Sequence, residues 1–287
     1  MKLDGMPVAV VGMARSGVAA VDLLREQGAH VWGVDQNPVQ IPGVRVLPQK
    51  EESLARAEWI VLSPGVPADL GVIEAARRRG ARVIGDLELA GWFLLGPIIG
   101  VTGSNGKTTT TALTGHILEA CGIPAQVGGN IGTPPASMVK TSRAGQWNVL
   151  ELSSFQLETT DSFRAHIGAA LNITPDHLDR HHTVERYAAA KGRLFTNQTQ
   201  DDFTVLNAED PFCVAFAGGR GRVVWFSSTR EVAPGAFLKD GKIILHGQEL
   251  MLASEVPLRG VHNLENTMAA AAMTQLPAQR TRISAPP

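Results

Sequence analysis

The chain has 287 residues, of which 44% are hydrophobic and 18% are charged. At roughly 150 residues per domain this length indicates two domains, and the apolar fraction excludes an intrinsically disordered chain. Lysine and arginine total 26 against 27 aspartate and glutamate residues, a formal net charge of −1. This balance provides no overall positive field, so we expect neither nucleic acid nor a membrane as a partner.

The cysteine count and the N-terminus point to the cytoplasm. Two cysteines, Cys121 and Cys213, are too few for a disulfide framework, which is typical of a reducing compartment. The N-terminal sequence MKLDGMPVAVVG holds an apolar run too short for a signal peptide, and no run of about 20 apolar residues predicts a transmembrane helix. We therefore predict a cytoplasmic protein.

Strand-like and helix-like segments alternate over residues 1–93. Short β-branched runs predict strands, apolar residues at helical spacing predict helices, and a glycine follows each helix as a stop. The predicted strands are 7–12, 30–35, 59–62 and 81–84, and the predicted helices are 18–27 and 73–79. Such alternation is typical of α/β folds, so we predict a Rossmann-like parallel-sheet domain over residues 1–93.

A second alternating block covers residues 94–274. Its predicted strands are 97–101, 147–152, 165–173, 203–206, 223–226 and a hairpin over 237–245; its predicted helices are one ending near residue 120, 184–195 and 262–273. We predict a P-loop NTPase-like central α/β domain with a smaller β subsheet. Residues 275–287 hold three prolines and no apolar periodicity, which predicts an irregular tail.

A glycine-rich loop carries the strongest functional signal. The run GVTGSNGKTT (100–109) follows a predicted strand and opens a predicted helix. The strict phosphate-loop pattern G-x-x-x-x-G-K-[ST] requires glycine where this chain has Val101, but the glycine-lysine-threonine core is intact. We interpret the segment as an ATP-binding loop rather than an incidental turn. Its predicted ATP contacts are Gly103, Ser104, Asn105, Gly106, Lys107, Thr108 and Thr109.

These residue types suit a triphosphate. Glycines let backbone N–H groups approach phosphate oxygens, and a helix N-terminus favours negative charge. We expect Lys107 to bridge the β- and γ-phosphates and the Thr108 hydroxyl to bind Mg²⁺.

Acidic, histidine and lysine side chains downstream are candidate site residues. Glu151 is the last residue of the apolar strand WNVLE. It could be a magnesium ligand or an acid exposed to solvent at the end of the strand. Asp176, His177 and Asp179 share one turn, which suits a second divalent ion or a capped polar turn. Lys191 lies among small residues of a predicted helix. Three roles are open for it: a lysine exposed to solvent, a contact to phosphate, or a metal ligand formed when CO₂ carbamylates the amine.

Several motifs in this order resemble the Mur ligase family. Besides the loop, they are GGNIG (128–132), ELSSFQLE (151–158), LNITPDHLDRH (171–181), AAAK (188–191) and HNLEN (262–266), and the resemblance covers about residues 1–273. It implies ATP-driven amide formation in peptidoglycan precursor synthesis. A carboxylate attacks the γ-phosphate to give an acyl phosphate, and an amine then displaces phosphate. The segments GGNIG and ELSSFQLETT most resemble the D-glutamate-adding members of the family, and this resemblance implies UDP-N-acetylmuramoyl-L-alanine and D-glutamate as the small-molecule substrates.

The resemblance also assigns roles to single residues and implies ATP and two Mg²⁺ ions as cofactors. The implied metal ligands are Thr108, Glu151, His177 and carbamylated Lys191; the catalytic candidates are Lys107, Lys191 and His177; Asn266, with His262 and Asn263, belongs to the adenine side.

By the same resemblance, the N-terminal domain is the pocket for the UDP portion of the substrate. Its turn is G-x-x-x-x-G rather than the G-x-G-x-x-G of NAD sites. The predicted contacts are Ala14, Arg15, Ser16 and Gly17 at the diphosphate, Asp35 and Gln36 at the uracil or ribose, Ser63, Pro64 and Gly65 in a second lining turn, and Asn130 near the muramoyl group.

Family members carry a further C-terminal domain that binds the amino acid, and we expect this chain to lack it. The expected behaviour is a monomer that binds ATP and the UDP substrate with little or no turnover on its own. Two alternatives are a ligase resembling folylpolyglutamate synthase, which shares the loop and the carbamylated lysine, and a non-catalytic nucleotide-binding remnant. The Rossmann-like block before the loop favours the Mur ligases over the folate ligases.

Overall fold

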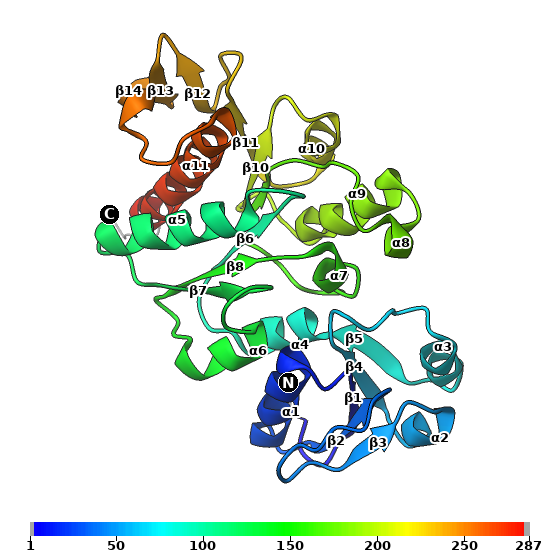
Figure 1. Cartoon of the computed structure of the whole chain (residues 1–287). Coiled ribbons are helices and arrows are strands. Elements are labelled where there is room, and N and C mark those ends of the chain that lie inside the picture. Colours follow the sequence, from blue (N-terminus) through cyan, green and yellow to red (C-terminus); the bar gives the residue numbers. More distant parts are fainter. Residues whose placement is uncertain (1–2, 284–287) are drawn as a thin grey trace. The chain divides into compact units, whose positions relative to one another are not determined.

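Two compact units make up the chain in the computed structural model, which describes residues 3–283 and side chains as far as residue 276 (Figure 1). Unit 1 holds the chain up to Leu95 together with Gly132–Arg143 and Phe155–Phe163. Unit 2 holds Gly96–Ile131, Ala144–Ser154 and the chain from Arg164 onward. We predicted a single boundary between residues 93 and 94. In the structure, Gly132–Arg143 and Phe155–Phe163 also belong to unit 1, and the sequence analysis did not predict this return. Their helices have four residues each, too few to show an apolar period.

The helices and strands follow one another in an α/β order. In chain order they are β1 (Pro7–Val11), α1 (Arg15–Glu26), β2 (His30–Asp35), β3 (Val46–Pro48), α2 (Glu51–Leu54), β4 (Trp59–Leu62), α3 (Gly71–Arg78), β5 (Arg82–Gly85), α4 (Asp86–Phe93), β6 (Ile98–Thr102), α5 (Lys107–Ala120), β7 (Ala125–Gly129), α6 (Pro135–Met138), β8 (Trp147–Glu151), α7 (Ser154–Leu157), β9 (Ile167–Ala170), α8 (Leu178–His181), α9 (Val184–Gly192), β10 (Phe203–Asn207), α10 (Pro211–Ala215), β11 (Arg222–Ser227), β12 (Gly235–Lys239), β13 (Lys242–Leu245), β14 (Gln248–Leu252) and α11 (Val261–Ile283). No helix within residues 3–283 is long and apolar enough to span a membrane.

Unit 1 is built on a parallel sheet with the strand order β3-β2-β1-β4-β5. The strands predicted over 30–35 and 59–62 are confirmed as β2 and β4. The strand β1 lies between β2 and β4, so successive connections leave it in opposite directions. In open α/β sheets, ligands bind at such a switch point, beyond the carboxyl ends of the strands. In unit 1 this point is the turn after β1 and the turn after β4.

Glu88, on α4, fixes one of the returning segments to unit 1. Its buried carboxylate accepts the backbone N–H groups of Asp161 (2.8 Å), Ser162 (2.9 Å) and Phe163 (2.9 Å). Burial alone would raise the pKa of Glu88, but these donors and the Ser162 hydroxyl together hold it below its usual value. The charged side chain therefore anchors the end of segment 155–163.

Unit 2 is built on one sheet of nine strands with the order β14-β13-β12-β11-β10-β9-β6-β8-β7. Neighbours from β7 to β12 are parallel, and β13 and β14 add an antiparallel edge. The predicted smaller subsheet is therefore the antiparallel end of the main sheet. The strand β6 lies between β8 and β9. The switch point of unit 2 is accordingly the loop after β6, beside the loop after β9.

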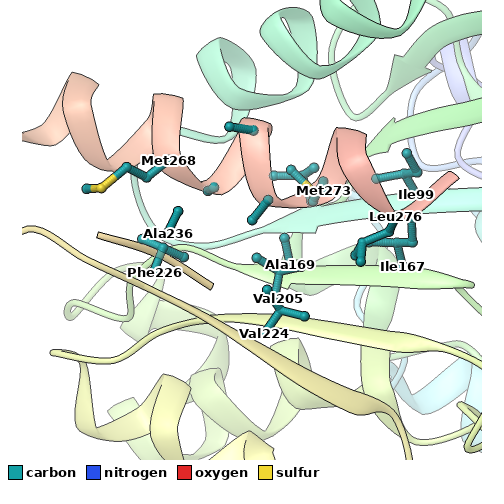
Figure 2. Close-up of a cluster of buried hydrophobic side chains, with 14 of the residues drawn as sticks. Ile99, Ile167, Ala169, Val205, Val224, Phe226, Ala236, Met268, Met273 and Leu276 are labelled. Carbon is teal, nitrogen blue, oxygen red and sulfur yellow. The ribbon is translucent and has the colours of Figure 1, made fainter. Parts of the chain in front are cut away.

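The core of unit 2 lies between the sheet and helices α5 and α11. Figure 2 shows Met268, Met273 and Leu276 of α11 pointing at apolar side chains of the sheet, among them Val205 and Phe226. These side chains are buried, and burying each one contributes about 1.5–3 kcal/mol. The core therefore fixes α11, which carries the HNLEN motif, against the sheet.

Glycines line the opposite face of the central strands. A Cβ at Gly100 would lie 2.8 Å from Leu194, and one at Gly168 would lie 2.8 Å from Phe195. Both partners follow α9 directly. Gly100 therefore serves close packing of α9 and its continuation on the sheet, which positions Lys191.

The prediction of an irregular tail over residues 275–287 is wrong in part, because α11 continues to Ile283. Leu276 is buried in the core, no glycine follows it, and Ala, Gln and Arg residues favour helix, so Pro277 alone does not end the element. Residues 284–287 of the predicted tail lie outside the described chain.

Candidate functional site

The loop of residues 103–108, termed the phosphate loop, has the backbone that its glycines predict. Gly103 and Gly106 have φ values of 149° and 82°, in a region that favours glycine. A Cβ at Gly103 would lie 3.0 Å from Leu171 Cβ, and one at Gly106 only 2.3 Å from Asn266 Oδ1. The two glycines inside the loop are thus required by conformation and space. The departure from the strict pattern at Val101 falls in β6, before the loop begins.

The loop after β9 holds the phosphate loop in place. Asn172 Oδ1 accepts the N–H of Asn105 (2.8 Å), and its Nδ2 donates to the Asn105 carbonyl (3.1 Å). Ser104 Oγ donates to the Thr174 carbonyl (3.0 Å) and accepts the Thr174 N–H (2.9 Å). Because both loops are bound to each other, the phosphate loop is preorganised for a ligand.

Lys107 folds back over the loop that precedes it. Its Nζ donates to the carbonyls of Gly103 (3.0 Å) and Ser104 (2.9 Å). Burial lowers the pKa of Lys107, and the negative charges of Glu151 and Asp176 partly oppose that shift. Among the described residues, the hydrogen-bond partners of this ammonium group are these two neutral carbonyls.

Thr108 and Glu151 lie side by side, as the metal prediction requires. Thr108 Oγ1 donates to Glu151 Oε2 (2.8 Å), and Asn130 Nδ2 donates to Glu151 Oε1 (3.1 Å). Only 3% of Glu151 is exposed. A buried carboxylate in contact with the hydroxyl of an exposed threonine thus provides two oxygen ligands beside the phosphate loop, which is the chemistry that Mg²⁺ prefers. Asn130, predicted near the muramoyl group, is placed here as a partner of Glu151.

Lys191 is buried at the other side of the loop rather than solvated. Its Nζ donates to the Gly103 carbonyl (2.8 Å) and lies 4.6 Å from the centre of the Tyr187 ring. Burial and, to a smaller extent, the charge of Lys107 lower the pKa of Lys191 to about 7, against the opposing charges of Asp176 and Glu151. A large share of this amine is therefore neutral near pH 7.

His177 and Asp176 stand at the start of α8 and are half-exposed. His177 has a φ of 52°, and its Nε2 lies 3.5 Å from Asp176 Oδ2. Within the described residues, no three His, Cys, Asp or Glu side chains form a group that could hold a metal ion. The predicted ligand set has only two such residues, Glu151 and His177, and depends on Thr108 and a modified Lys191 for the rest. Asp179 lies in the first turn of α8.

A cavity of about 440 Å³ opens beside the phosphate loop. Asn266, predicted near adenine, is 5% exposed and lines it, and His262 lines it as well. Asn263 instead accepts a hydrogen bond from Asn266 Nδ2 (3.2 Å). The full lining is Asn105, Gly106, Leu171, Asn172, Phe226, His262, Glu265 and Asn266. Its position next to Gly106 suits a base attached to phosphates in the loop.

The predicted UDP-contacting turn of unit 1 lies at the switch point of the sheet. Ser63 Oγ, after β4, donates to the Gly12 carbonyl (2.7 Å), after β1. A Cβ at Gly17 would lie 1.8 Å from that same carbonyl oxygen, so α1 begins in contact with the turn. The Arg15 guanidinium donates to the Gly132 carbonyl. Ala14 is the N-cap of α1 and makes no side-chain cap hydrogen bond, so it does not satisfy the first N–H groups of the helix.

Asp35 and Gln36 line a cavity of about 470 Å³ in unit 1. Asp35 accepts the N–H groups of Met13 (2.6 Å) and Asn37 (2.8 Å), so its carboxylate first serves the turn itself. Each oxygen keeps a further lone pair for a ligand. Pro64 and Gly65 lie in the turn that the Val66 N–H closes on the Ser63 carbonyl (2.9 Å).

The structure thus brings together two groups of predicted residues, each inside one unit. Sequence reasoning missed Tyr187, whose hydroxyl lies 3.2 Å from Ser104 Oγ and whose ring faces Lys191. It also gave no role to Asn172. Tyr187 precedes Lys191 by one helical turn, a spacing that predicts contact between the two side chains.

The phosphate loop lies at the switch point of the sheet, and a pair of oxygen ligands lies beside its lysine. These features define a phosphate-loop nucleotide-binding protein of the α/β class. Comparison with known families identifies the family within this class. The Mur ligase middle domain matches residues 101–274, and the Mur ligase MurD-like N-terminal domain matches residues 6–85. The chain belongs to the Mur ligase family, whose members are ATP-dependent and Mg²⁺-dependent amide-forming ligases of peptidoglycan synthesis. The match over residues 6–85 favours this family over the folate ligases.

Curated relatives are similar over almost all of this chain. It is 57% identical over 278 residues to the UDP-N-acetylmuramoylalanine--D-glutamate ligase of Solibacter usitatus, covering 94% of this chain and 63% of the relative. It is 46% identical over 287 residues to the enzyme of the same name from Koribacter versatilis, again covering 94% and 63%. The chain therefore spans less than two thirds of the length of these relatives.

Solved structures show the same fold at low sequence identity. The UDP-N-acetylmuramate:L-alanyl-gamma-D-glutamyl-meso-diaminopimelate ligase from Neisseria meningitides has a TM-score of 0.62 at 18% identity, covering 94% of this chain and 93% of that one. The UDP-N-acetylmuramate-alanine ligase from Thermotoga maritima has a TM-score of 0.57 at 21% identity, covering 95% and 65%.

Proposed function

We propose that this chain carries the ATP-binding and UDP-substrate-binding parts of a ligase that adds D-glutamate to UDP-N-acetylmuramoyl-L-alanine. The observation that carries the proposal is the phosphate loop with Lys107 above it and the Thr108–Glu151 pair beside it. The similarity to the Solibacter and Koribacter ligases supports the choice of substrates.

The chemistry requires two anions, a carboxylate and a triphosphate, to meet. A carboxylate oxygen of the alanyl group attacks the γ-phosphorus, the bond to the bridging oxygen breaks, and ADP leaves. The amine of D-glutamate then attacks the acyl carbon, loses a proton, and inorganic phosphate leaves. The N–H groups of the phosphate loop and the ammonium group of Lys107 would hold the phosphates and offset their charge.

Thr108 and Glu151 fit a first Mg²⁺, and His177 with a carbamylated Lys191 fits a second. When bound, such ions screen phosphate charge and orient the transferred group. The fit of the first site rests on the hydrogen bond between Thr108 and Glu151, two oxygen donors already in contact. The fit of the second rests on the half-exposed imidazole side chain of His177.

Carbamylation of Lys191 would begin with its neutral amine. The nitrogen lone pair forms a bond to the carbon of CO₂, one C=O electron pair moves to oxygen, and the nitrogen loses a proton, which leaves an anionic carbamate. A pKa of about 7 supports this step, because most of the amine is unprotonated at pH 8. Carbon-13 NMR with labelled bicarbonate should show a carbamate signal that disappears in Lys191→Arg and persists in Lys140→Met, an exposed-lysine control. A wild-type protein without this signal at pH 8 would reject the modification.

In unit 1, we propose that the turn 12–17 binds the diphosphate and that the cavity beside Asp35 and Gln36 binds the uracil or ribose. Support comes from the switch point of the sheet and from the uncapped N-terminus of α1. We further propose a monomer acting in the cytoplasm, which light scattering of the purified chain and cell fractionation would test.

Thermal unfolding in the presence of ligands tests the function. We expect ATP–Mg²⁺ to raise the melting temperature, and UDP-N-acetylmuramoyl-L-alanine to raise it beyond the effect of UDP. Stabilisation by a bound ligand follows mass action, about 2.7 kcal/mol at a hundred times its Kd. ATP stabilisation without any effect of the UDP ligands would instead support a folate-ligase-like enzyme, and no response to either would support a non-catalytic remnant.

A further inference from the structure

Unit 1 contains a buried carboxylate that the proposed function leaves unused. Asp86, the first residue of α4, is 1% exposed. Neither of its carboxylate oxygens has a partner at standard hydrogen-bond geometry among the described residues. An unpaired buried carboxylate costs several kcal/mol, so its retention calls for a ligand-related or proton-related explanation.

The Ser16 hydroxyl is the side chain that interacts with the Asp86 carboxylate. Burial raises the pKa of Asp86 to about 7, while the Leu87 N–H, the Ser16 hydroxyl and its own N–H partly oppose the rise. Ser16 belongs to the turn to which we assign the diphosphate. It is half-buried, so part of the residue is accessible to solvent.

Charged groups do not account for this state of Asp86. The elements in contact with α4 are α1, α6, β4 and β5, and a Cβ at the neighbouring Gly85 would meet Thr159. Their charged residues, with those of α4 and segment 155–163, are Arg15, Asp22, Arg25, Glu26, Arg82, Glu88, Glu158 and Asp161. None of them contributes to the raised pKa of Asp86. Several are engaged elsewhere: Glu26 pairs with Lys140, and Arg82 pairs with Asp161.

We propose that Asp86 is a positioning residue that, as the neutral acid, donates its proton to Ser16 Oγ and leaves the Ser16 hydroxyl free to donate to a phosphate oxygen. A hydroxyl has one proton, so Ser16 cannot donate to an ionised Asp86 and to a phosphate at once. Binding of the diphosphate therefore favours protonated Asp86. This inference rests on the proposed binding of a UDP-linked substrate to the turn 12–17.

Proton uptake on binding follows, with a defined sign. Below about pH 7 Asp86 is already protonated, so affinity is highest and changes little with pH. As pH rises through 7, the free protein loses this proton and must regain it to bind, so affinity falls by up to about tenfold per pH unit. Near pH 8 we expect the uptake of close to one proton per ligand bound.

Isothermal titration calorimetry with UDP-N-acetylmuramoyl-L-alanine, at pH 6.0, 7.0 and 8.5 and in buffers of different ionisation enthalpy, tests this. Both phosphates of this ligand are esterified, so its charge is constant there, whereas a terminal phosphate titrates near pH 6. Asp86→Asn supplies a permanent N–H donor to Ser16. It should bind with the affinity of the wild type at pH 6.0, without pH dependence or proton uptake. Asp22→Asn, an exposed change on α1, is the control and should keep the wild-type profile.

Each outcome separates the two proposals. A wild-type affinity that is constant from pH 6.0 to 8.5, or an Asp86→Asn profile that falls like that of the wild type, overturns the role of Asp86 while leaving the substrate site intact. No binding at any pH overturns the assignment of the turn itself, and with it this inference. Circular dichroism of each variant establishes that it is folded.

Discussion

A Cβ atom on Gly106 would lie 2.3 Å from Oδ1 of Asn266, a residue on the helix that closes the core of unit 2. The phosphate loop and the HNLEN motif are therefore packed against each other. Position 106 must be glycine for two reasons, its φ of 82° and this close contact.

We expect Gly106→Ala to weaken ATP binding by at least about tenfold, because either Asn266 or the loop must move. Gly122→Ala is the matched control. Its φ of 72° gives a similar backbone strain, but no atom lies within 4 Å of the added Cβ. Calorimetric titration with ATP–Mg²⁺ should show the loss in Gly106→Ala alone. Equal affinities in the two variants would contradict the proposed role of this contact.

Lys107→Met removes the one cationic residue of the phosphate-loop sequence 103–108, whose Nζ lies on the carbonyls of Gly103 and Ser104. Hydrogen bonds between charged groups contribute about 1.5–3 kcal/mol, so ATP affinity should fall by roughly 10-fold to 150-fold. Melting temperature without nucleotide should change little, because Lys107 bonds only to carbonyls of its own loop. Lys140→Met, which breaks an exposed ion pair with Glu26, should leave ATP affinity unchanged. An unaltered affinity in Lys107→Met would remove the basis of the nucleotide site.

Glu151→Gln keeps the size of the side chain and removes its charge. The amide still reaches Thr108 and Asn130, so the fold should persist, but a neutral oxygen is a poorer Mg²⁺ ligand. Titration with ATP in the presence and absence of Mg²⁺ should show that the gain in affinity from Mg²⁺ shrinks by about tenfold. Glu119→Gln, exposed on α5, is the control. A Mg²⁺ effect of normal size in Glu151→Gln would argue against this ligand.

Glu88→Ala should destabilise unit 1 by about 2–4 kcal/mol, because three buried N–H groups lose a charged acceptor. Glu74→Ala, which removes an exposed ion pair with Arg77, should cost less than about 1 kcal/mol. The pH dependence has a definite sign. The folded-state pKa of Glu88 lies below its usual 4.5, so its contribution is present above that pH and is lost as pH falls through the folded value. Urea unfolding at pH 7 and pH 3 should show the difference between wild type and Glu88→Ala shrinking at the lower pH.

The sequence predicted most of the strands and the position of the glycine-rich loop between a strand and a helix, because both depend on local patterns, but β3, β7 and β14 were not predicted. Strands β2 and β4 are short and largely apolar, and helix α5 begins directly after Gly106 of the glycine-rich loop. The Thr108–Glu151 contact was predictable because the carboxyl ends of parallel strands meet at one edge of the sheet.

Other features depend on contacts between residues distant in the chain, so they could not be predicted from the sequence. The return of segments 132–143 and 155–163 to unit 1 depends on acceptors such as Glu88, about 70 positions earlier than its partners. The burial of Lys191 depends on Gly100 and Gly168, which let its helix approach the sheet. The continuation of α11 through Pro277 depends on a core that holds the helix up to Leu276.

A crystal structure with a non-hydrolysable ATP analogue and Mg²⁺ would show directly whether residues 103–108 bind the phosphates. We expect the phosphates to lie within this loop and Lys107 Nζ to move from the carbonyls of Gly103 and Ser104, at 3.0 Å and 2.9 Å, onto a phosphate oxygen. A nucleotide bound elsewhere, with Lys107 still on these carbonyls, would contradict this expectation.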